Sequence, residues 1–343
     1  MSFTRVPRHL RLQSIAVFFA LMPIAACTGG HAIARLDTAG LAGPAWFSPT
    51  RPADRTTLAR WSAGVGPPVV RTWTTQEASP TDTLCVISWN TALGTGDVQR
   101  LLDDVRVERG NVPIVLLLQE AYREGPEVPE GRTLSASFAG RLGGERSVEI
   151  ELLAERLGMN LYYVPSMRNG APWETDEDRG NAILSTLPLE QLSAVELPFE
   201  RQRRVAVAAT ISATSTDGIP WRLRVVSAHL DNLVGLRRGW FVGAEYARVR
   251  QTRALLDYVR DDSAVILAGD FNTWFGSAEP AYGAIARVFP DTDSSDRQPT
   301  FMGLLRLDHM FFRLPDGWRG TFKRGADRYG SDHYPLIGSI DLK

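Results

Sequence analysis

Six short segments carry side chains that can bind a cation or transfer a proton. Each places a carboxylate, amide or imidazole group just past an apolar run. Several carboxylates that meet in one cleft repel each other unless a cation or a shared proton relieves their charge. Oxygen ligands of this kind favour Mg²⁺, with Mn²⁺ or Ca²⁺ as alternatives. The segments are Ser88-Trp89-Asn90, Leu118-Gln119-Glu120, Ser227-Ala228-His229-Leu230-Asp231-Asn232, Gly269-Asp270-Phe271-Asn272, Leu307-Asp308-His309 and Ser331-Asp332-His333.

The apolar runs that precede these segments predict the elements that must position them. Residues 84–87, 114–118, 223–226 and 264–268 are short, apolar and largely β-branched, which is typical of buried strands. A buried strand can carry an unpaired polar group only near its end, where the chain leaves the core. We therefore expect the polar segments to converge at one edge of the sheets.

The remaining pattern predicts helices around two sheets. Asp97 is placed to cap a helix, residues 149–157 and 245–259 have helical apolar spacing, and the stretches between them alternate as strands do. Several of the turns are too short for crossover helices, so the sheets must be partly antiparallel. Two sheets packed face to face with helices outside would bury every apolar face, which predicts an α/β fold.

The ordered set of motifs resembles the endonuclease/exonuclease/phosphatase superfamily. Its members include deoxyribonuclease I, apurinic endonucleases, neutral sphingomyelinases and inositol polyphosphate 5-phosphatases. The resemblance extends over residues 84–342. One motif alone is weak, since Gly-Asp-Phe-Asn also suits a simple turn, but all six occur in order. The resemblance implies a deoxyribonuclease I-like, four-layered α/β/β/α sandwich of two mainly antiparallel sheets flanked by helices.

The resemblance assigns three residues to a divalent metal, expected to be Mg²⁺. Glu120 ends an almost wholly apolar strand, and an unpaired carboxylate there is costly to bury. The family places the counterpart of Glu120 on the metal, with Asn90 and Asp332 near the same ion. The structural alternative is that Asn90 and Asp332 are hydrogen-bonded loop residues.

Five further residues are implied in catalysis. The resemblance makes Asp270 and Asn272 orient or activate the attacking water and bind phosphate, although a structural Asx turn is an alternative. A histidine transfers protons near neutral pH when a carboxylate supports its charged form, and the implied pair is His333 with Asp308. His229 is the second imidazole, expected to contact the scissile phosphate.

The expected reaction is metal-dependent hydrolysis of a phosphodiester, in either nucleic acid or phospholipid. Aromatic pairs at Trp240-Phe241 and Trp274-Phe275 can seat against lipid, stack on bases, or simply pack in the core. The net charge of −1 carries no overall electrostatic attraction to nucleic acid. The alternatives are a phosphomonoesterase and a non-catalytic surface binding lipoprotein on the same fold.

The N-terminus predicts export. Arginines precede an apolar stretch at residues 15–26 that has the length of a secretory signal, and the sequence Ile24-Ala25-Ala26-Cys27 resembles a bacterial lipobox. We expect a signal peptide over residues 1–26, with lipidated Cys27 as the new N-terminus; ordinary cleavage near Ala26 is the alternative. The expected location is the outer face of a bacterial membrane or the periplasm.

The rest of the chain divides into two parts. Residues 27–80 are rich in small residues and proline without a sustained apolar period, so they are expected to form a tether with partial docking. Residues 81–343 are expected to form one catalytic domain, acting as a monomer. The two cysteines exclude a disulfide framework, and Cys85 is expected to be a buried thiol.

Overall fold

A computed structural model of the chain describes residues 30–36, 43–74, 79–129, 147–168, 176–232, 240–292 and 296–343, with only the backbone described at residues 240–245. The expected signal peptide, Cys27 and the side chains of Trp240 and Phe241 therefore lie outside the described residues. Within this described part of the chain, no helix is both long and apolar enough to cross a bilayer.

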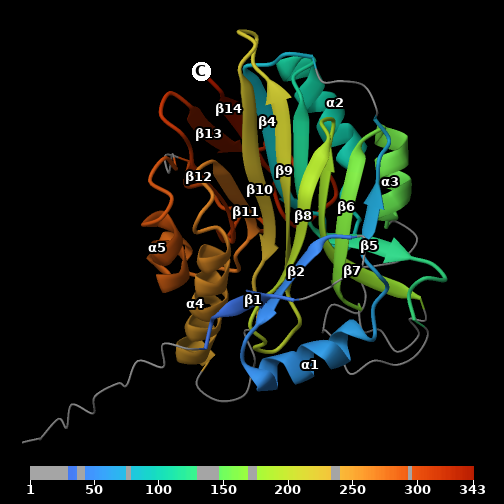
Figure 1. The fold of residues 1–343 in the computed structure, drawn as a ribbon, viewed down its shortest axis with the longest axis vertical. Helices are drawn as coiled ribbons and strands as arrows, with labels where there is room; N and C mark the ends of the chain where they lie inside the picture. Colours follow the sequence, from blue (N-terminus) through green and yellow to red (C-terminus); the bar gives the residue numbers. More distant parts are fainter. Residues whose placement is uncertain are drawn as a thin grey trace, which may run out of the picture.

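Two seven-stranded mixed sheets form the centre of the described structure (Figure 1). Most neighbouring strands are antiparallel, while β2 with β8, β10 with β11 and β4 with β5 are parallel. In spatial order the first sheet contains β1 (Ile33–Arg35), β2 (Ala45–Pro49), β8 (Leu189–Glu196), β9 (Val205–Thr214), β10 (Pro220–His229), β11 (Val265–Asp270) and β12 (Asp308–Arg313). The second contains β13 (Arg319–Arg324), β14 (Leu336–Asp341), β4 (Thr83–Asn90), β5 (Ile114–Glu124), β7 (Glu177–Ser185), β6 (Asn160–Met167) and β3 (Val69–Arg71).

Helices cover the outer faces of both sheets. In Figure 1, α4 (Trp240–Tyr258) and α5 (Pro280–Ala286) lie at the left, and α2 (Val98–Arg109) and α3 (Ile150–Leu157) lie at the right. A further helix, α1 (Pro52–Ser62), lies across the lower end of the view, and a short 3₁₀ turn, η1 (Gly276–Ala278), precedes α5. This arrangement confirms the predicted α/β/β/α sandwich.

Strand alternation explains how the layers pack. In β9, Val205 and Val207 face the core between the two sheets, while Ala206 and Ala208 face the helix layer that contains Leu255 of α4. A strand places successive side chains on opposite faces, so a wholly apolar strand fits between two buried layers. The predicted buried runs in β4, β5, β10 and β11 therefore lie in the middle of the sandwich.

The helix starts follow from their capping residues. The Asp97 side chain accepts a hydrogen bond from the Arg100 backbone N–H (3.0 Å), as its position before α2 predicted. At α3, Glu149 accepts one from the Leu152 backbone N–H (2.7 Å). Each acceptor satisfies an N–H that has no partner within the helix.

The segment at residues 27–80 contributes regular structure to both sheets. Residues 33–35 and 45–49 form strands at one edge of the first sheet, and residues 69–71 extend the second. Two hydrogen bonds attach the chain just before β3. The Gly66 backbone N–H donates to Asp178 (2.8 Å), and Arg123 donates to the Pro67 carbonyl (2.7 Å). These contacts fix the described part of the segment to the second sheet.

Candidate active site

Three adjacent strands bring three predicted site residues into one row. The parallel pairing of β10 with β11 sets His229 beside Asp270, and the antiparallel pairing of β11 with β12 sets Asp270 opposite Asp308. All three side chains are buried. The row exists because β10 and β11 end, and the antiparallel β12 begins, at the same edge of the sheet.

Asp270 joins this row to the second sheet. Its Oδ2 accepts a hydrogen bond from Asn90 Nδ2 at the end of β4 (3.0 Å). The same oxygen lies 3.4 Å from His229 Nε2 and 3.8 Å from His333 Nε2. Its Oδ1 accepts the backbone N–H of Asn272 (2.9 Å). One carboxylate therefore links five of the eight predicted residues, itself included.

The turn after β11 depends on a glycine before Asp270. Gly269 has a φ of +150°, and a Cβ at that position would stand 1.8 Å from the Ala228 carbonyl oxygen of β10. No other residue can occupy this place without moving the neighbouring strand. Asn272 follows with a φ of +50°, and its Nδ2 donates to the Leu230 carbonyl (3.0 Å).

His333 and Asp308 form a buried pair. His333 Nδ1 and Asp308 Oδ2 are 2.8 Å apart. Ser331 holds the histidine segment against β4, because its Oγ accepts the His333 N–H (3.0 Å) and donates to the Asn90 carbonyl (2.7 Å). Burial opposes the charged imidazole, but the charge and hydrogen bond of Asp308 prevail and raise the pKa of His333 to about 10.

The pKa values of the other two titratable groups, His229 and Asp270, are shifted in the direction that favours the uncharged form of each. Burial lowers the pKa of His229 well below its usual value, and the positive charge of Arg204 adds to this effect. Burial, followed by the negative charge of Asp308, raises the pKa of Asp270 to about 7. A neutral imidazole, an imidazolium and a carboxylate that titrates near neutral pH thus lie together, which suits proton transfer.

Glu120 reaches the site through a β-bulge. We expected it at the end of its strand, but β5 continues to Glu124, so that expectation was wrong. The pairing of β5 with β7 shifts register between Leu118 and Ala121, and Glu120 has a φ of +51°. A bulge redirects one side chain without ending the strand. The Glu120 carboxylate is partly exposed and lies 3.5 Å from Arg179.

The site fits a divalent cation in its donor chemistry. Asp332 Oδ1 and Asp308 Oδ1 are buried oxygens without a hydrogen-bond partner among the described residues. Burial raises the pKa of Asp332, and the nearby charge of Glu120 contributes. Unsatisfied buried carboxylate oxygens are the ligands that Mg²⁺, Mn²⁺ and Ca²⁺ take.

The geometry also brings together a group that the sequence did not predict as ligands. One ligand atom each from Asp270, Asp308 and His333 lies within 4.8 Å of the others. His333 and Asp308 are already hydrogen-bonded to each other, which occupies one oxygen of Asp308; its other oxygen, like Asp332 Oδ1, lacks a hydrogen-bond partner among the described residues. We therefore retain Asn90, Glu120 and Asp332 as the predicted set and regard the second group as the proton-transfer centre.

Two arginines beside the site were missed from the sequence. Arg179, on β7, lies beside Glu120, and Arg204, directly before β9, is buried near His229. Nearly all the positive charge of this chain is arginine, with lysine only at Lys323 and Lys343, so residue type singles out neither arginine. Only the fold, which sets these two arginines beside the candidate site, reveals them.

The neighbouring residues His309 and Trp274-Phe275 lie outside this constellation. His309 Nε2 is 2.7 Å from Thr273 Oγ1, and its ring packs against Tyr282. Trp274 is partly buried, whereas Phe275, three residues after Asn272, is 51 % exposed. Phe275 therefore offers an aromatic surface near the site edge.

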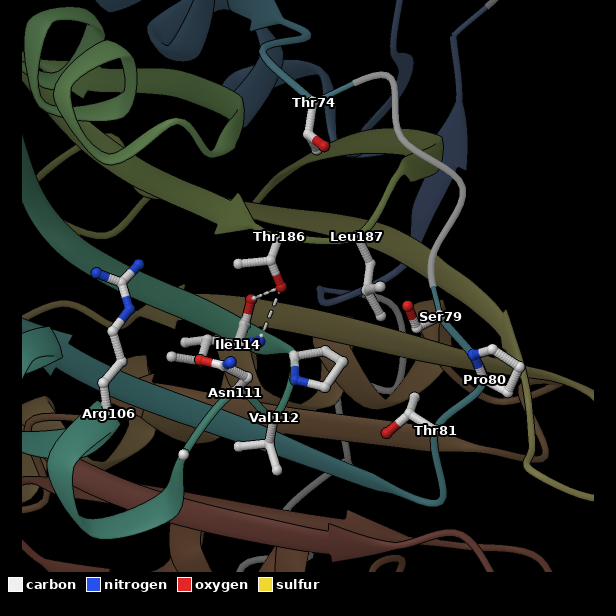
Figure 2. Close-up of a pocket in the computed structure, with 12 residues that line it drawn as sticks. Thr74, Ser79, Pro80, Thr81, Arg106, Asn111, Val112, Ile114, Thr186 and Leu187 are labelled. Carbon is white, nitrogen blue, oxygen red and sulfur yellow. Dashed lines mark hydrogen bonds between the residues drawn. The ribbon is translucent and has the colours of Figure 1, made fainter.

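A separate pocket of about 580 Å³ lies at the opposite edge of the second sheet (Figure 2). It is lined by the start of β5, the end of α2 and the turn after β7, where Thr186 accepts a hydrogen bond from the Ile114 N–H (2.9 Å). None of the eight predicted site residues lines this pocket. The pocket lies at the start of β5, whereas Glu120 lies toward the other end of that strand.

Fold and site together define an α/β sandwich with an acid, amide and imidazole centre at one sheet edge, which is the class expected for phosphoester hydrolases. The sequence matches the model of the Endonuclease/Exonuclease/phosphatase family over residues 87–333. The chain belongs to this family. No curated protein sequence matches it significantly.

Solved structures that are similar to this chain are distant from it in sequence. An endonuclease/exonuclease/phosphatase family protein from Leptotrichia buccalis is 15% identical, with a TM-score of 0.50 over 75% of this chain and 99% of that chain. A family protein from Bacteroides thetaiotaomicron is 15% identical (TM-score 0.47; 77% and 98% covered). A 3′-5′ exonuclease from Neisseria meningitidis is 16% identical (TM-score 0.42; 75% and 99% covered). At these identities the likeness concerns the fold alone.

Proposed function

We propose that this protein is a divalent-metal-dependent phosphodiesterase. The observation that carries the proposal is the buried Asp270 carboxylate, which contacts Asn90, His229 and His333 at once and titrates near neutral pH. Membership of a family named for nucleases and phosphatases supports phosphoester hydrolysis as the reaction class. The charged and neutral groups needed for water attack on such a bond are all within this cluster.

The cation-binding part of the proposal rests on Asn90, Glu120 and Asp332. When bound there, Mg²⁺, or alternatively Mn²⁺ or Ca²⁺, would neutralise charge on the phosphoryl oxygens. The Asp332 oxygen without a partner among the described residues and the bulge that turns Glu120 toward the site support this assignment.

The protein's own residues divide the proton chemistry. Asp270, with a pKa near 7, can accept a proton from the attacking water, while the Asn272 backbone N–H holds its other oxygen. His333, kept charged by Asp308, can donate a hydrogen bond or a proton to the phosphoryl group. The neutral His229 can contact the same phosphate without adding repulsion among cations.

The proposed substrate is a phosphodiester of nucleic acid or phospholipid. The exposed Phe275 ring favours a substrate with an apolar or aromatic portion beside the phosphate. A phosphomonoesterase or a non-catalytic binding protein is the alternative, yet a binding role alone gives no reason to keep an acid, an imidazolium and a neutral imidazole within one cluster.

A substrate panel tests this proposal directly. The purified full chain is assayed in detergent on DNA, RNA, sphingomyelin, phosphoinositides, bis(p-nitrophenyl) phosphate and p-nitrophenyl phosphate, with Mg²⁺ or with EDTA. We expect Mg²⁺-dependent turnover of at least one diester and much slower turnover of the monoester. Equal rates with EDTA would refute the metal requirement, and faster monoester turnover would favour the phosphatase alternative.

We further propose that the protein is an exported, monomeric lipoprotein held to the membrane through Cys27. Each buried lipid methylene contributes about 0.8 kcal/mol, so two or more acyl chains hold a protein that would otherwise wash off. Cys27→Ala should move the protein to the soluble fraction and abolish labelling by a palmitate analogue. Cys85→Ala, which removes the buried thiol of β4, is the matched control and should leave both unchanged.

A further inference from the structure

The exposed side of helix α1 carries positive charge alone. Arg51, directly before the helix, and Arg55 and Arg60 within it are exposed. The one acidic residue of α1, Asp54, is buried and lies 3.2 Å from Arg250 Nη1 of α4. No other acidic residue of the helix balances the three arginines, which we call the α1 surface.

The opposite side of α1 is held by the body of the protein. Leu58 is buried, and the Trp61 ring packs against Phe199, with 5.7 Å between the ring centroids. Asp54 reaches α4 through its ion pair. The inner side of the helix is thus occupied by contacts within the chain, and its arginine side is turned to solvent.

The chain that leads back to Cys27 leaves the described structure beside α1. Arg250 Nη1 donates both to the Gly30 carbonyl (3.0 Å) and to Asp54 (3.2 Å), so one nitrogen joins Gly30 to the helix. Three peptide steps separate Cys27 from Gly30. Each step spans about 3.8 Å, which keeps their Cα atoms within about 11 Å of each other. Acyl chains on Cys27 would therefore hold the membrane close to α1.

The α1 surface lies at the same end of the molecule as the candidate site. Phe199, which packs on α1, belongs to the connection between β8 and β9. In that connection, the backbone N–H groups of Arg201 and Gln202 donate to Asp231 (2.9 and 3.2 Å), two residues after the end of β10. Figure 1 shows β10 running toward the end of the molecule where α1 lies.

We propose that the α1 surface docks on anionic phospholipid headgroups and turns the catalytic edge toward the membrane. The inference rests on the proposed attachment through Cys27 and goes beyond the proposed reaction. Attraction between arginines and an anionic bilayer adds up over several side chains and falls off within a Debye length. An anchor beside α1 keeps its arginines within reach of the headgroups, which raises their effective concentration there. This proximity favours lipid over nucleic acid as the partner.

Vesicle binding tests the charge of the α1 surface without help from acyl chains. Full-length Cys27→Ala protein is sedimented with vesicles of phosphatidylcholine alone or of phosphatidylcholine mixed with phosphatidylglycerol. Arg51→Gln, Arg55→Gln and Arg60→Gln are combined in one variant. We expect it to lose about 10- to 100-fold in affinity for the anionic vesicles at low salt and nothing for the neutral ones. High salt should remove the difference.

Two further variants make this comparison specific. Arg106→Gln, Arg222→Gln and Arg319→Gln, combined at exposed positions outside α1, change the net charge equally and should leave anionic binding within about twofold. Arg55 Nε also donates to the Pro49 carbonyl (2.7 Å). Arg51→Gln with Arg60→Gln keeps that bond and should still weaken anionic binding, so it decides the matter if the triple variant fails to fold.

A fluorescent probe tests the orientation of the attached protein. Thr56→Cys on the exposed side of α1 and Val107→Cys on α2 are labelled separately with a polarity-sensitive dye in the lipidated chain, where Cys85 is buried. In anionic vesicles, the signal at position 56 should rise clearly above that at position 107. The three α1 substitutions to Gln should remove this rise.

Different outcomes separate this inference from the other proposals. Equal anionic binding by the α1 variants and the control variant, equal signals at positions 56 and 107, or α1-dependent binding to a DNA duplex but not to vesicles would overturn it. A Cys27→Ala protein that stays in the membrane fraction would refute the lipid anchor, whereas α1-dependent binding to anionic vesicles would still support the docking surface. No measurement here uses turnover, so an absence of diesterase activity would refute the proposed reaction alone.

Discussion

Two groups of carboxylates in this protein differ in how completely their oxygens are paired. Asp178, in β7, is wholly buried, and each of its oxygens has partners. Its Oδ1 accepts from Arg123 Nε (3.0 Å) and the Tyr163 hydroxyl (2.7 Å), and its Oδ2 accepts the Gly66 backbone N–H (2.8 Å). This cluster joins β5, β6, β7 and the N-terminal segment.

The carboxylates at the active-site edge are paired only in part. Asp308 has one oxygen on His333, while its other oxygen and the Oδ1 of Asp332 lack a hydrogen-bond partner within the described ranges. Asp178 and Asp308 are both buried, whereas Asp332 is partly exposed, so burial alone does not distinguish the two groups. A complete set of partners stabilises the fold, whereas an incomplete set leaves binding capacity for a ligand.

The largest effect is expected at the incompletely paired edge, from Glu120→Gln. Removing one charge from the predicted cation ligands should lower turnover at saturating Mg²⁺ by roughly three orders of magnitude or more. The fold should persist, because the Glu120 side chain is partly exposed. Glu124→Gln, an exposed position on the same strand, is the matched control and should stay near full activity. A Glu120→Gln variant with more than about a tenth of normal turnover would remove Glu120 from the ligand set.

The second prediction concerns the Asp308–His333 pair. Asp308→Asn should keep the shape of the side chain but favour the wrong imidazole tautomer and remove the charge that supports imidazolium. We expect a loss of about two to three decades in rate. The fold should remain, as circular dichroism and the unfolding temperature would show.

A double-mutant cycle sharpens this test. Adding His333→Ala to Asp308→Asn should reduce the rate little further, because the two residues act as one unit. His229→Ala should add its own penalty to either variant, because its imidazole lies on the other side of Asp270 in the strand order and is not hydrogen-bonded to Asp308. Independent, multiplying losses for Asp308 and His333 would exclude the pair.

The third prediction moves to the fully paired cluster. Asp178→Asn leaves the Arg123 cation buried without its charge partner, so the free energy of unfolding should fall by about 3 kcal/mol. Turnover measured well below the unfolding temperature should change little. Urea denaturation and steady-state kinetics on the same sample check both parts. A loss of activity without a loss of stability would contradict the division between the two clusters.

The sequence predicted the elements whose local pattern is strong. The buried runs of β4, β5, β10 and β11, the cap at Asp97 and the helix after Glu149 were all found where expected, because each depends on neighbouring residues. The strands β1 and β3 could not be predicted, since each has three residues and exists only through pairing with a distant strand.

The proximity of some candidate site residues was predictable from the sequence, but their detailed geometry was not. Motif order placed Asp270, Asp308 and His333 together, and the strand pairing agrees. The bulge at Glu120 was missed because a register shift depends on the partner strand, β7. Arg204 was missed for a different reason: an arginine becomes informative only when its burial and its place beside the candidate site are known.

The smallest effect is expected where a carboxylate is well paired but near the surface. Asp82 accepts a hydrogen bond from the Thr216 backbone N–H (2.9 Å), and its Oδ2 lies 2.8 Å from Lys343 Nζ. The hydrogen bond from Lys343, followed by that from Thr216, lowers the pKa of Asp82 from 3.8 to about 2. A lowered folded-state pKa means that this group stabilises the protein above pH 3.8, and that the contribution disappears as the pH falls toward 2. Solvent screening keeps such a contribution small, so Asp82→Asn should lower the unfolding temperature at pH 6 by only about 1 °C. Unfolding temperatures of both proteins measured from pH 6 down to pH 2 should converge at the acidic end. If Asp82→Asn were as damaging as Asp178→Asn, complete pairing would matter regardless of burial, and the contrast between the two groups of carboxylates would lose its physical basis.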